Sequence, residues 1–194
     1  MRAIKSPLIL ASSSPQRLSL LRGAGFKPEV RAPVINESIL TGESAKSLVE
    51  RLAVEKLNAV INAGECGVAA DTVVSINEKI LGKPGSPEMA LEMLQTLSAK
   101  THDVITGVAL SGPKGRRSLT VTTRVKWREL SKKEIVTYVQ TGEPLDKAGG
   151  YGIQGGGKNF VVSFEGSFDN IVGLPVDEVV SCLSELGCDC SSNF

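Results

Sequence analysis

The sequence predicts an α/β protein in which helices flank a mixed, twisted β-sheet. Short apolar runs of strand length alternate with longer segments of helical periodicity, and no internal repeat or long proline- or serine-rich linker interrupts them. Short turns between some strands indicate antiparallel neighbours, while strands separated by helices favour parallel ones. With 194 residues, 41% of them hydrophobic, the chain can bury a substantial core, and we expect a single domain over residues 1–194.

Charge and composition exclude several classes of protein. A net charge of +1 offers no broad basic surface, so we expect neither a nucleic-acid nor a membrane partner. The apolar run at residues 8–11 is too short for a signal-peptide core or a membrane span. Four sparse cysteines fit free thiols in a reducing compartment, and we expect a cytoplasmic protein. They are Cys66, Cys182, Cys188 and Cys190, and with one histidine in the chain they make a poor zinc set.

The first strand, residues 8–11, leads directly into a helix. Ser14 is suited to the N-cap and Pro15 to the first turn, and the helix is expected to end near Gly23. Backbone N–H groups and serine hydroxyls at a helix N-terminus form a site for an anion, to which Arg17 would add positive charge. The segment therefore indicates either a phosphate site or a plain capped helix whose Arg17 faces solvent.

A second helix is predicted over residues 44–62, and a lysine interrupts its apolar stripe. Lys56 follows Leu52 by four positions and precedes Val60 by four, so it lies on the buried face. Its ammonium group must either extend to water along the apolar surface or meet a buried anion.

The strand predicted at residues 67–76 places a carboxylate, Asp71, inside an apolar run. A buried carboxylate needs a compensating cation, which suggests a metal ion or a nearby lysine or arginine. Lys56 is one candidate. The alternative is that Asp71 lies at the end of the strand, in water, and caps a turn.

The middle of the chain predicts a hairpin, a helix and two longer strands. Residues 79–81 return antiparallel to the Asp71 strand, and Ser86 begins a helix whose apolar face is core. Strands at 101–111 and 119–127 follow; the second alternates apolar and cationic residues, so one face is either solvated or attractive to an anionic ligand. His102 has no companion at ligand spacing and is interpreted as structural.

The last third carries a capping box and a glycine-rich segment. Ser131 caps a helix that runs through Val139. The segment EPLDKAGGYGIQGGGKNF, at 143–160, brings charged residues among glycines and either lets the backbone approach a ligand or forms a tight hairpin. Two strands, 160–164 and 168–172, are expected on either side of a turn, and a last helix begins at Pro175.

Six strings in this order make the chain resemble the Maf family of nucleoside triphosphate pyrophosphatases. They are SSSPQR at 12–17, RLAVEK at 51–56, AADT at 69–72, LGKP at 81–84, GEPLDKAGGYGIQG at 142–155 and IVGLP at 171–175. The resemblance implies a fold of two lobes around a central cleft, similar to inosine triphosphatases. It also implies hydrolysis between the α and β phosphates with Mg²⁺ or Mn²⁺, limiting excess or non-canonical nucleotides, and a homodimer.

The resemblance also implies roles for particular residues. Asp71 corresponds to the catalytic aspartate and Glu37 to its acidic partner, and both would serve the metal. The implied phosphate-binding residues are Ser12, Ser14, Arg17, Lys56 and Lys83. The branch similar to dTTP and UTP pyrophosphatases carries the equivalents of Thr72 and Gln154. Gln16 stands where that branch usually has arginine, and Asn36–Glu37 replaces a pair of acids.

A second class of function remains open on the sequence. A nucleotide-binding regulator, or an interaction protein linked to cell division, would use the same phosphate-binding groups without turnover. Carboxylates that face a triphosphate repel it unless a metal intervenes, and this favours an enzyme.

Overall fold

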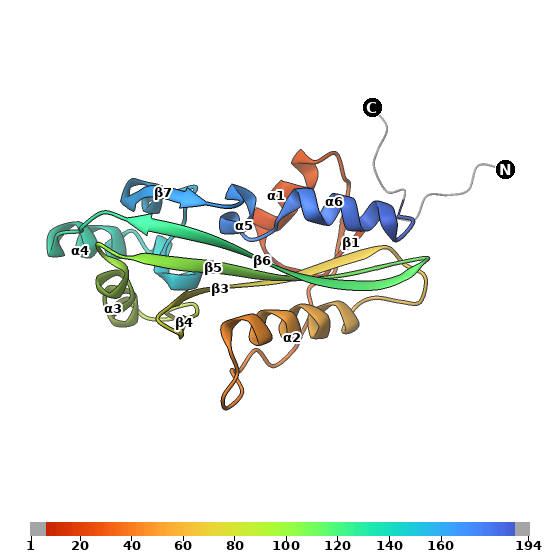
Figure 1. The fold of residues 1–194 in the computed structure, drawn as a ribbon, viewed down its shortest axis with the longest axis horizontal. Helices are drawn as coiled ribbons and strands as arrows, with labels where there is room; N and C mark the ends of the chain where they lie inside the picture. The colour runs from red at the N-terminus through yellow and green to blue at the C-terminus, as the bar shows by residue number, and fades with distance from the viewer. Residues whose placement is uncertain (1–6, 189–194) are drawn as a thin grey trace. The chain divides into compact units, whose positions relative to one another are not determined.

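The computed structural model describes residues 7–188, and these form two compact units (Figure 1). The first unit contains the described residues up to Asp71, then Thr106–Val121, and the described residues from Gly173 onward. The second unit contains Thr72–Ile105 and Thr122–Val172. The chain therefore leaves and re-enters the first unit twice. Both units are built from segments that are separate in the sequence.

A seven-stranded sheet has the order β2-β1-β3-β5-β6-β7, with β4 paired to β3. The strands are β1 Ile9–Leu10, β2 Glu29–Val30, β3 Gly67–Ile76, β4 Lys79–Leu81, β5 Thr101–Gly112, β6 Gly115–Trp127 and β7 Val161–Glu165. Strand β1 runs parallel to β2 and β3, whereas β4 is antiparallel to β3 and β7 is antiparallel to β6. The sheet is mixed, which confirms the predicted fold class.

The described helices follow the predicted order except for α5, where a strand was expected. They are α1 Pro15–Gly23, α2 Ala45–Asn58, α3 Pro87–Leu97, α4 Lys132–Gln140, α5 Phe168–Val172 and α6 Val176–Glu185, with 3₁₀ turns η1 Glu143–Asp146, η2 Ala148–Gly150 and η3 Gly156–Phe160. Serine side chains cap the N-termini of α1 to α4, and α4 has the predicted capping box. No helix among the described residues combines the length and apolar character that a membrane crossing requires.

Alternation along β3 divides the core of the first unit between two faces of the sheet. Val68 and Ala70 pack with residues of α1 and α6, whereas Ala69 packs with Ala53 and Leu57 of α2. Figure 1 shows α1 and α6 on one side of the strands and α2 on the other. Because Asp71 is two positions after Ala69, its side chain belongs to the α2 face.

The second unit has its own core, built on α3 and α4. Leu94 of α3 and Ile135 of α4 pack with Val74, Val125 and Trp127 of the strands. The aromatic rings meet edge to face, as between Trp127 and Tyr151, whose ring centroids are 4.7 Å apart. This core supports the glycine-rich segment.

Three predictions of local structure are wrong. Residues 168–172 form α5 and not a strand, because Ser167 Oγ accepts a hydrogen bond from Asn170 N at 3.2 Å and begins a helical turn. Of the two alternatives left open for the glycine-rich segment, the tight hairpin is wrong, because the segment forms successive 3₁₀ turns. The second helix ends at Asn58, short of residue 62. The short strand β2 was not predicted, and both its residues are exposed.

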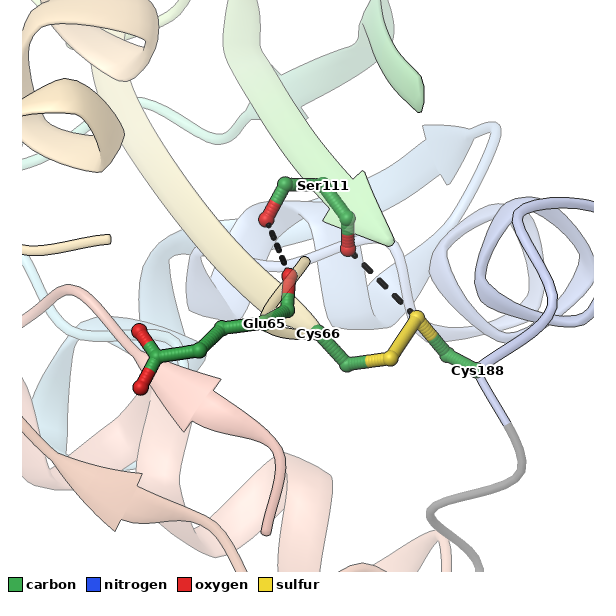
Figure 2. Close-up of a disulfide and its surroundings, with 4 residues drawn as sticks. All are labelled: Glu65, Cys66, Ser111 and Cys188. Atoms are coloured by element: carbon green, nitrogen blue, oxygen red, sulfur yellow. Dashed lines mark hydrogen bonds between the residues drawn. A yellow bond between two sulfur atoms is a disulfide. The ribbon is translucent and has the colours of Figure 1, made fainter. Parts of the chain in front are cut away.

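The expectation of free thiols is also wrong for two of the cysteines. Cys66 and Cys188 form a disulfide with a Cα–Cα distance of 5.7 Å, although 122 positions separate them (Figure 2). Ser111 Oγ donates to the Glu65 carbonyl at 2.9 Å, and the Ser111 carbonyl oxygen lies 3.4 Å from Cys188 Sγ. Cys182 is free, and Cys190 lies outside the described residues.

Candidate active site

The predicted buried carboxylate and the predicted buried ammonium meet in the first unit. Asp71 is 7% exposed and Lys56 is 6% exposed, and Lys56 Nζ lies 2.6 Å from Asp71 Oδ1. Asp71 therefore lies within the buried part of β3, and the alternative of a solvated turn at a strand end is wrong. Lys56 meets a buried anion, so its stem does not simply carry the charge out to water.

Glu37 brings a second carboxylate to the same ammonium group. Its Oε1 lies 3.1 Å from Lys56 Nζ, and its side chain is 54% exposed. The loop that carries it is held on α2 by Arg51, which donates to the Ser38 carbonyl at 3.0 Å and to both Glu43 oxygens. Arg51 and the Leu40 N–H lower the pKa of Glu43 to about 2, so this anchor stays charged at neutral pH.

The N-terminus of α1 holds Arg17 toward these carboxylates. Ser12 Oγ accepts from Ser14 N at 3.2 Å and from Arg17 Nη1 at 3.3 Å, and Arg17 Nε donates to the Gly173 carbonyl at 2.9 Å. Burial lowers the pKa of Arg17, while the charges of Asp71 and Glu37 oppose that shift. Since a guanidinium does not deprotonate in proteins, the site keeps a second fixed cation.

Gln16 is engaged with the helix cap. Its Oε1 accepts from Ser14 Oγ at 3.0 Å, and Ser14 Oγ in turn accepts from Arg17 N at 3.4 Å. Gln16 is only partly buried, so its amide nitrogen is not enclosed by the core. The predicted residues of the first unit thus form two hydrogen-bonded or ion-paired sets, and Arg17 of one set lies in the electrostatic field of Asp71 and Glu37 of the other.

Three predicted site residues belong to the second unit. Thr72 follows Asp71 in β3 and is partly buried. Lys83 is exposed directly after β4, where Gly149 N donates to the Gly82 carbonyl at 3.0 Å and ties this turn to the glycine-rich segment. Gln154 is exposed between η2 and η3.

His102 has the structural position expected of it. It is 2% exposed, and its Nε2 lies 2.9 Å from the Tyr151 hydroxyl oxygen. Burial lowers the pKa of His102 to about 4, so the ring is neutral at physiological pH. It packs edge to face against Trp127 and Tyr151 in the core of the second unit.

Sequence reasoning from residue types alone did not identify Glu37, which only the family resemblance indicated. The loop around it has no periodicity, and its neighbours are exposed. The one local signal is the pairing of Glu43 with Arg51, eight positions apart, which fixes the loop on α2.

The fold and the site together define an α/β protein with paired carboxylates, a buried ammonium group and a guanidinium at one helix N-terminus. Such a set suits a polyanionic substrate. Comparison with known proteins identifies the group to which it belongs: residues 7–186 match the family of Maf-like proteins, and the chain is a member of that family.

Relatives match over nearly the whole length. A dTTP/UTP pyrophosphatase of Myxococcus xanthus is 46% identical over 189 residues, covering 96% of each chain. A dTTP/UTP pyrophosphatase of Exiguobacterium sibiricum is 42% identical and covers 93% of each chain. A solved structure of a nucleoside-triphosphatase, dITP/XTP pyrophosphatase, from Mycobacterium abscessus is similar with a TM-score of 0.45 and 16% identity, over 93% of this chain and 96% of that one.

Proposed function

We propose that this protein hydrolyses dTTP and UTP to the nucleoside monophosphate and pyrophosphate. The observation that carries the proposal is the buried Lys56–Asp71 pair, with Glu37 and Arg17 beside it, in a chain 46% identical to a dTTP/UTP pyrophosphatase. Structural ion pairs also occur in protein interiors, and the similarity to a dTTP/UTP pyrophosphatase over 96% of the chain favours the functional interpretation here.

The residues fit a divalent cation that arrives with its substrate. Among the residues that the structure describes, no three His, Cys, Asp or Glu side chains come together as a ready-made metal site. Asp71 and Glu37 nevertheless both contact Lys56, which places two carboxylates next to one another. Mg²⁺ is commonly held by one or two carboxylates together with substrate phosphates and water. We therefore propose that Asp71 and Glu37 bind Mg²⁺ or Mn²⁺, which when bound would neutralise phosphate charge.

The chain's own groups divide the remaining work. Asp71 is the candidate base that takes a proton from the attacking water, and its ion pair with Lys56 holds the carboxylate in place. Arg17 and the N-terminus of α1 are suited to phosphate oxygens. Lys56 and Lys83 would stabilise the charge that develops on the departing pyrophosphate, as the family resemblance implies. Catalysis of this kind depends on position and charge more than on covalent chemistry.

Base selection is assigned to Gln16, Thr72 and Gln154. A polar side chain that pairs with a base edge rejects bases that leave it unpaired, because an unsatisfied polar group is costly. Both Thr72 and Gln154 agree with the dTTP and UTP branch that the sequence resembles. Gln16 lacks the charge and the planar fork of arginine, so we expect a weaker preference than in a relative that carries arginine there.

A panel of nucleoside triphosphates tests the proposal. Pyrophosphate release is measured for dTTP, UTP, dCTP, ATP and GTP with Mg²⁺, with Mn²⁺, and with a chelator, using Asp71→Asn as the matched control. We expect the fastest release from dTTP and UTP, dependence on the metal, and loss of at least about 10²-fold in kcat in the variant. Preference for a purine nucleotide would contradict the assignment of substrate, and equal turnover by Asp71→Asn would contradict its role.

The location and assembly of the protein are separate proposals. We expect a cytoplasmic protein because its proposed substrates are precursors of nucleic-acid synthesis, although the Cys66–Cys188 disulfide is uncommon in that compartment. The homodimer implied by the family resemblance is tested by light scattering of the purified protein. Nucleotide binding without turnover, which a purely regulatory protein would show, is the alternative outcome of the panel.

A further inference from the structure

Both ends of the turn that carries Gln154 are tied to one carboxylate in the second unit. Gly152 N donates to the Tyr138 hydroxyl oxygen at 3.1 Å, and that hydroxyl donates to Glu143 Oε1 at 2.9 Å. Gly156 N donates to Glu143 Oε2 at 3.0 Å. The two oxygens of Glu143 therefore close a hydrogen-bonded ring around residues 152–156, with Gln154 between the two tied positions.

The turn is packed so closely on this carboxylate that a side chain at Gly152 or Gly155 would force the Glu143 carboxylate to move out of its place. A Cβ at Gly152 would lie 2.7 Å from Glu143 Oε1, and a Cβ at Gly155 would meet the same oxygen. A Cβ at Gly157 would lie 2.7 Å from the Gly152 carbonyl oxygen. The glycines give the backbone this close approach, but they also leave the free turn with many conformations, so a fixed turn needs external hydrogen bonds.

Tyr138, the second residue in this hydrogen-bonded ring, is held by the core. Tyr138 is 6% exposed in α4 and packs edge to face on Phe160 with a centroid separation of 5.0 Å. Burial, together with the nearby Glu143 carboxylate, raises the pKa of Tyr138, so its hydroxyl remains a donor at neutral pH. Ile153 is buried while Gln154 is exposed, so the turn inserts one residue into the core and presents the next.

We propose that Glu143 and Tyr138 are positioning residues that fix Gln154 for recognition of the nucleotide base. This inference rests on the proposed function, in which Gln154 pairs with the base. A displacement of about 1 Å in a positioned group can cost up to about 10²-fold in rate, and a hydrogen-bonding amide on an untethered glycine turn would sample many such displacements. Both residues are hydrogen-bonded to the turn that carries Gln154 and have no proposed role at the phosphates, so their effect is expected on selection between bases.

The test combines a local measurement with a ratio of rate constants. Glu143→Ala removes the acceptor for Gly156 N and the carboxylate that orients the Tyr138 hydroxyl. Tyr138→Phe removes the hydroxyl that accepts from Gly152 N and keeps the ring packing, and Glu143→Gln is the conservative variant. Its amide oxygen can accept from Gly156 N while its amide nitrogen donates to the Tyr138 oxygen. Glu129→Ala, which removes an exposed carboxylate of the same unit, is the matched control.

We expect faster hydrogen exchange at the amides of residues 152–156 in Glu143→Ala, and a fall of about tenfold in the preference for dTTP over dCTP, measured as the ratio of kcat/KM values. This ratio does not depend on the fraction of protein that is folded, so a merely structural role would leave it unchanged. Tyr138→Phe should show a smaller effect of the same kind, and Glu143→Gln and Glu129→Ala should resemble the unmodified protein.

Unchanged amide exchange in both Glu143→Ala and Tyr138→Phe would overturn the inference, and so would unchanged base preference in a variant whose turn exchanges faster. If Glu143→Ala does not fold, Tyr138→Phe decides the question by the same two measurements. Absence of pyrophosphate release by the unmodified protein would instead overturn the proposed function on which the inference rests, and this result is obtained before any variant is made.

Discussion

In the proposed mechanism, the Lys56–Asp71 ion pair serves both the stability of the fold and the chemistry of the site. Two buried charges lose much of their hydration, and only close contact with each other offsets that loss. The pair is 2.6 Å apart, and Glu37 and Arg17 extend it to a group with charges of both signs. A site of this kind keeps its ion pair in the folded protein and offers charged groups to a polyanionic ligand.

Removing one partner of this pair should destabilise the protein more than removing both. Lys56→Met leaves Asp71 buried without its ammonium, so we expect the free energy of unfolding to fall by about 3–5 kcal/mol. The double variant Lys56→Met/Asp71→Asn should recover part of that loss, while pyrophosphate release stays at least about 10²-fold down in all variants. Urea unfolding measures the free energy of unfolding, and a pyrophosphate assay measures the turnover. Full turnover in Lys56→Met would show that Lys56 only covers the core, and full stability would show that the ion pair does not stabilise the fold.

His102 should make stability depend on pH in a defined window. Its pKa is about 4 in the folded protein against 6.5 when unperturbed, so between these values the unfolded chain binds more protons. The stabilising contribution is therefore complete above about pH 6.5 and is lost as the pH falls toward about 4. We expect the free energy of unfolding to fall by about 2 kcal/mol from about pH 7 to about pH 5 for this residue alone.

The neutral variant His102→Gln provides the comparison for this pH dependence. Its amide can still bond to the Tyr151 hydroxyl, and it cannot take up a proton in this range. Denaturant unfolding at several pH values should give a shallower slope in the variant. Equal slopes in the two proteins would show that His102 does not titrate with a lowered pKa.

At the scale of the element, the N-terminus of α1 combines helix capping with the proposed binding of substrate phosphate. Ser14 caps the helix, and its hydroxyl also donates to Gln16, while Ser12 orients Arg17. A helix N-terminus presents positive potential, so the same cap that stabilises α1 prepares it for phosphate. Residue 16 thus lies at the cap, beside the groups proposed to bind phosphate.

Gln16→Arg should sharpen the preference for pyrimidine nucleotides. Arginine adds a charge and a planar fork of donors, so we expect kcat/KM for dTTP or UTP to rise by about tenfold relative to ATP and GTP. Gln16→Lys adds the charge without the fork and should raise the ratio less. Unchanged ratios in Gln16→Arg would mean that residue 16 takes no part in base selection.

At the scale of the whole molecule, the Cys66–Cys188 disulfide closes most of the chain into one loop. A cross-link over 122 positions restricts the unfolded chain strongly, and disulfides of long loops stabilise proteins by about 2–5 kcal/mol. Both sulfurs belong to the first unit, one at the start of β3 and the other after α6. The bond therefore fixes the end of the described chain onto the sheet.

Breaking the disulfide should lower the free energy of unfolding by about 2–5 kcal/mol. Thermal and urea unfolding with and without dithiothreitol measure this effect. The double variant Cys66→Ser/Cys188→Ser should match the reduced protein and should not respond to the reductant, whereas Cys182→Ser, which leaves the bond intact, should behave like the unmodified protein. A reductant effect of the same size in the double variant would assign it to another cause.

The sequence predicted elements wherever periodicity and local caps agreed. Residues 67–76 are apolar on both faces and form β3, and Ser131 and Glu134 form the capping box of α4. The prediction failed at residues 168–172, where hydrogen bonds from Asn170 to the Val104 carbonyl and to Thr123 help to hold a short helix that alternation did not indicate. A helix this short is not stable by itself, so it forms only where tertiary contacts hold it.

Part of the candidate site could also be predicted from the periodic pattern of the sequence. Lys56 and Asp71 stood out because each is a charge in an apolar pattern, and the structure joins them. Glu37, Glu143 and Cys188 gave no such signal. Each lies outside the periodic helices and strands, and its role depends on contacts with another part of the chain. Pairings of this kind follow from the folded chain and are not readable from residue spacing.

Identification of the products made from dTTP tests the central claim most directly. The purified protein is incubated with dTTP and Mg²⁺, and the products are separated by ion exchange and quantified by phosphorus NMR. Hydrolysis between the α and β phosphates predicts equal amounts of dTMP and pyrophosphate, with neither formed by Asp71→Asn at a comparable rate. Formation of dTDP and orthophosphate, or no hydrolysis at all, would contradict the account.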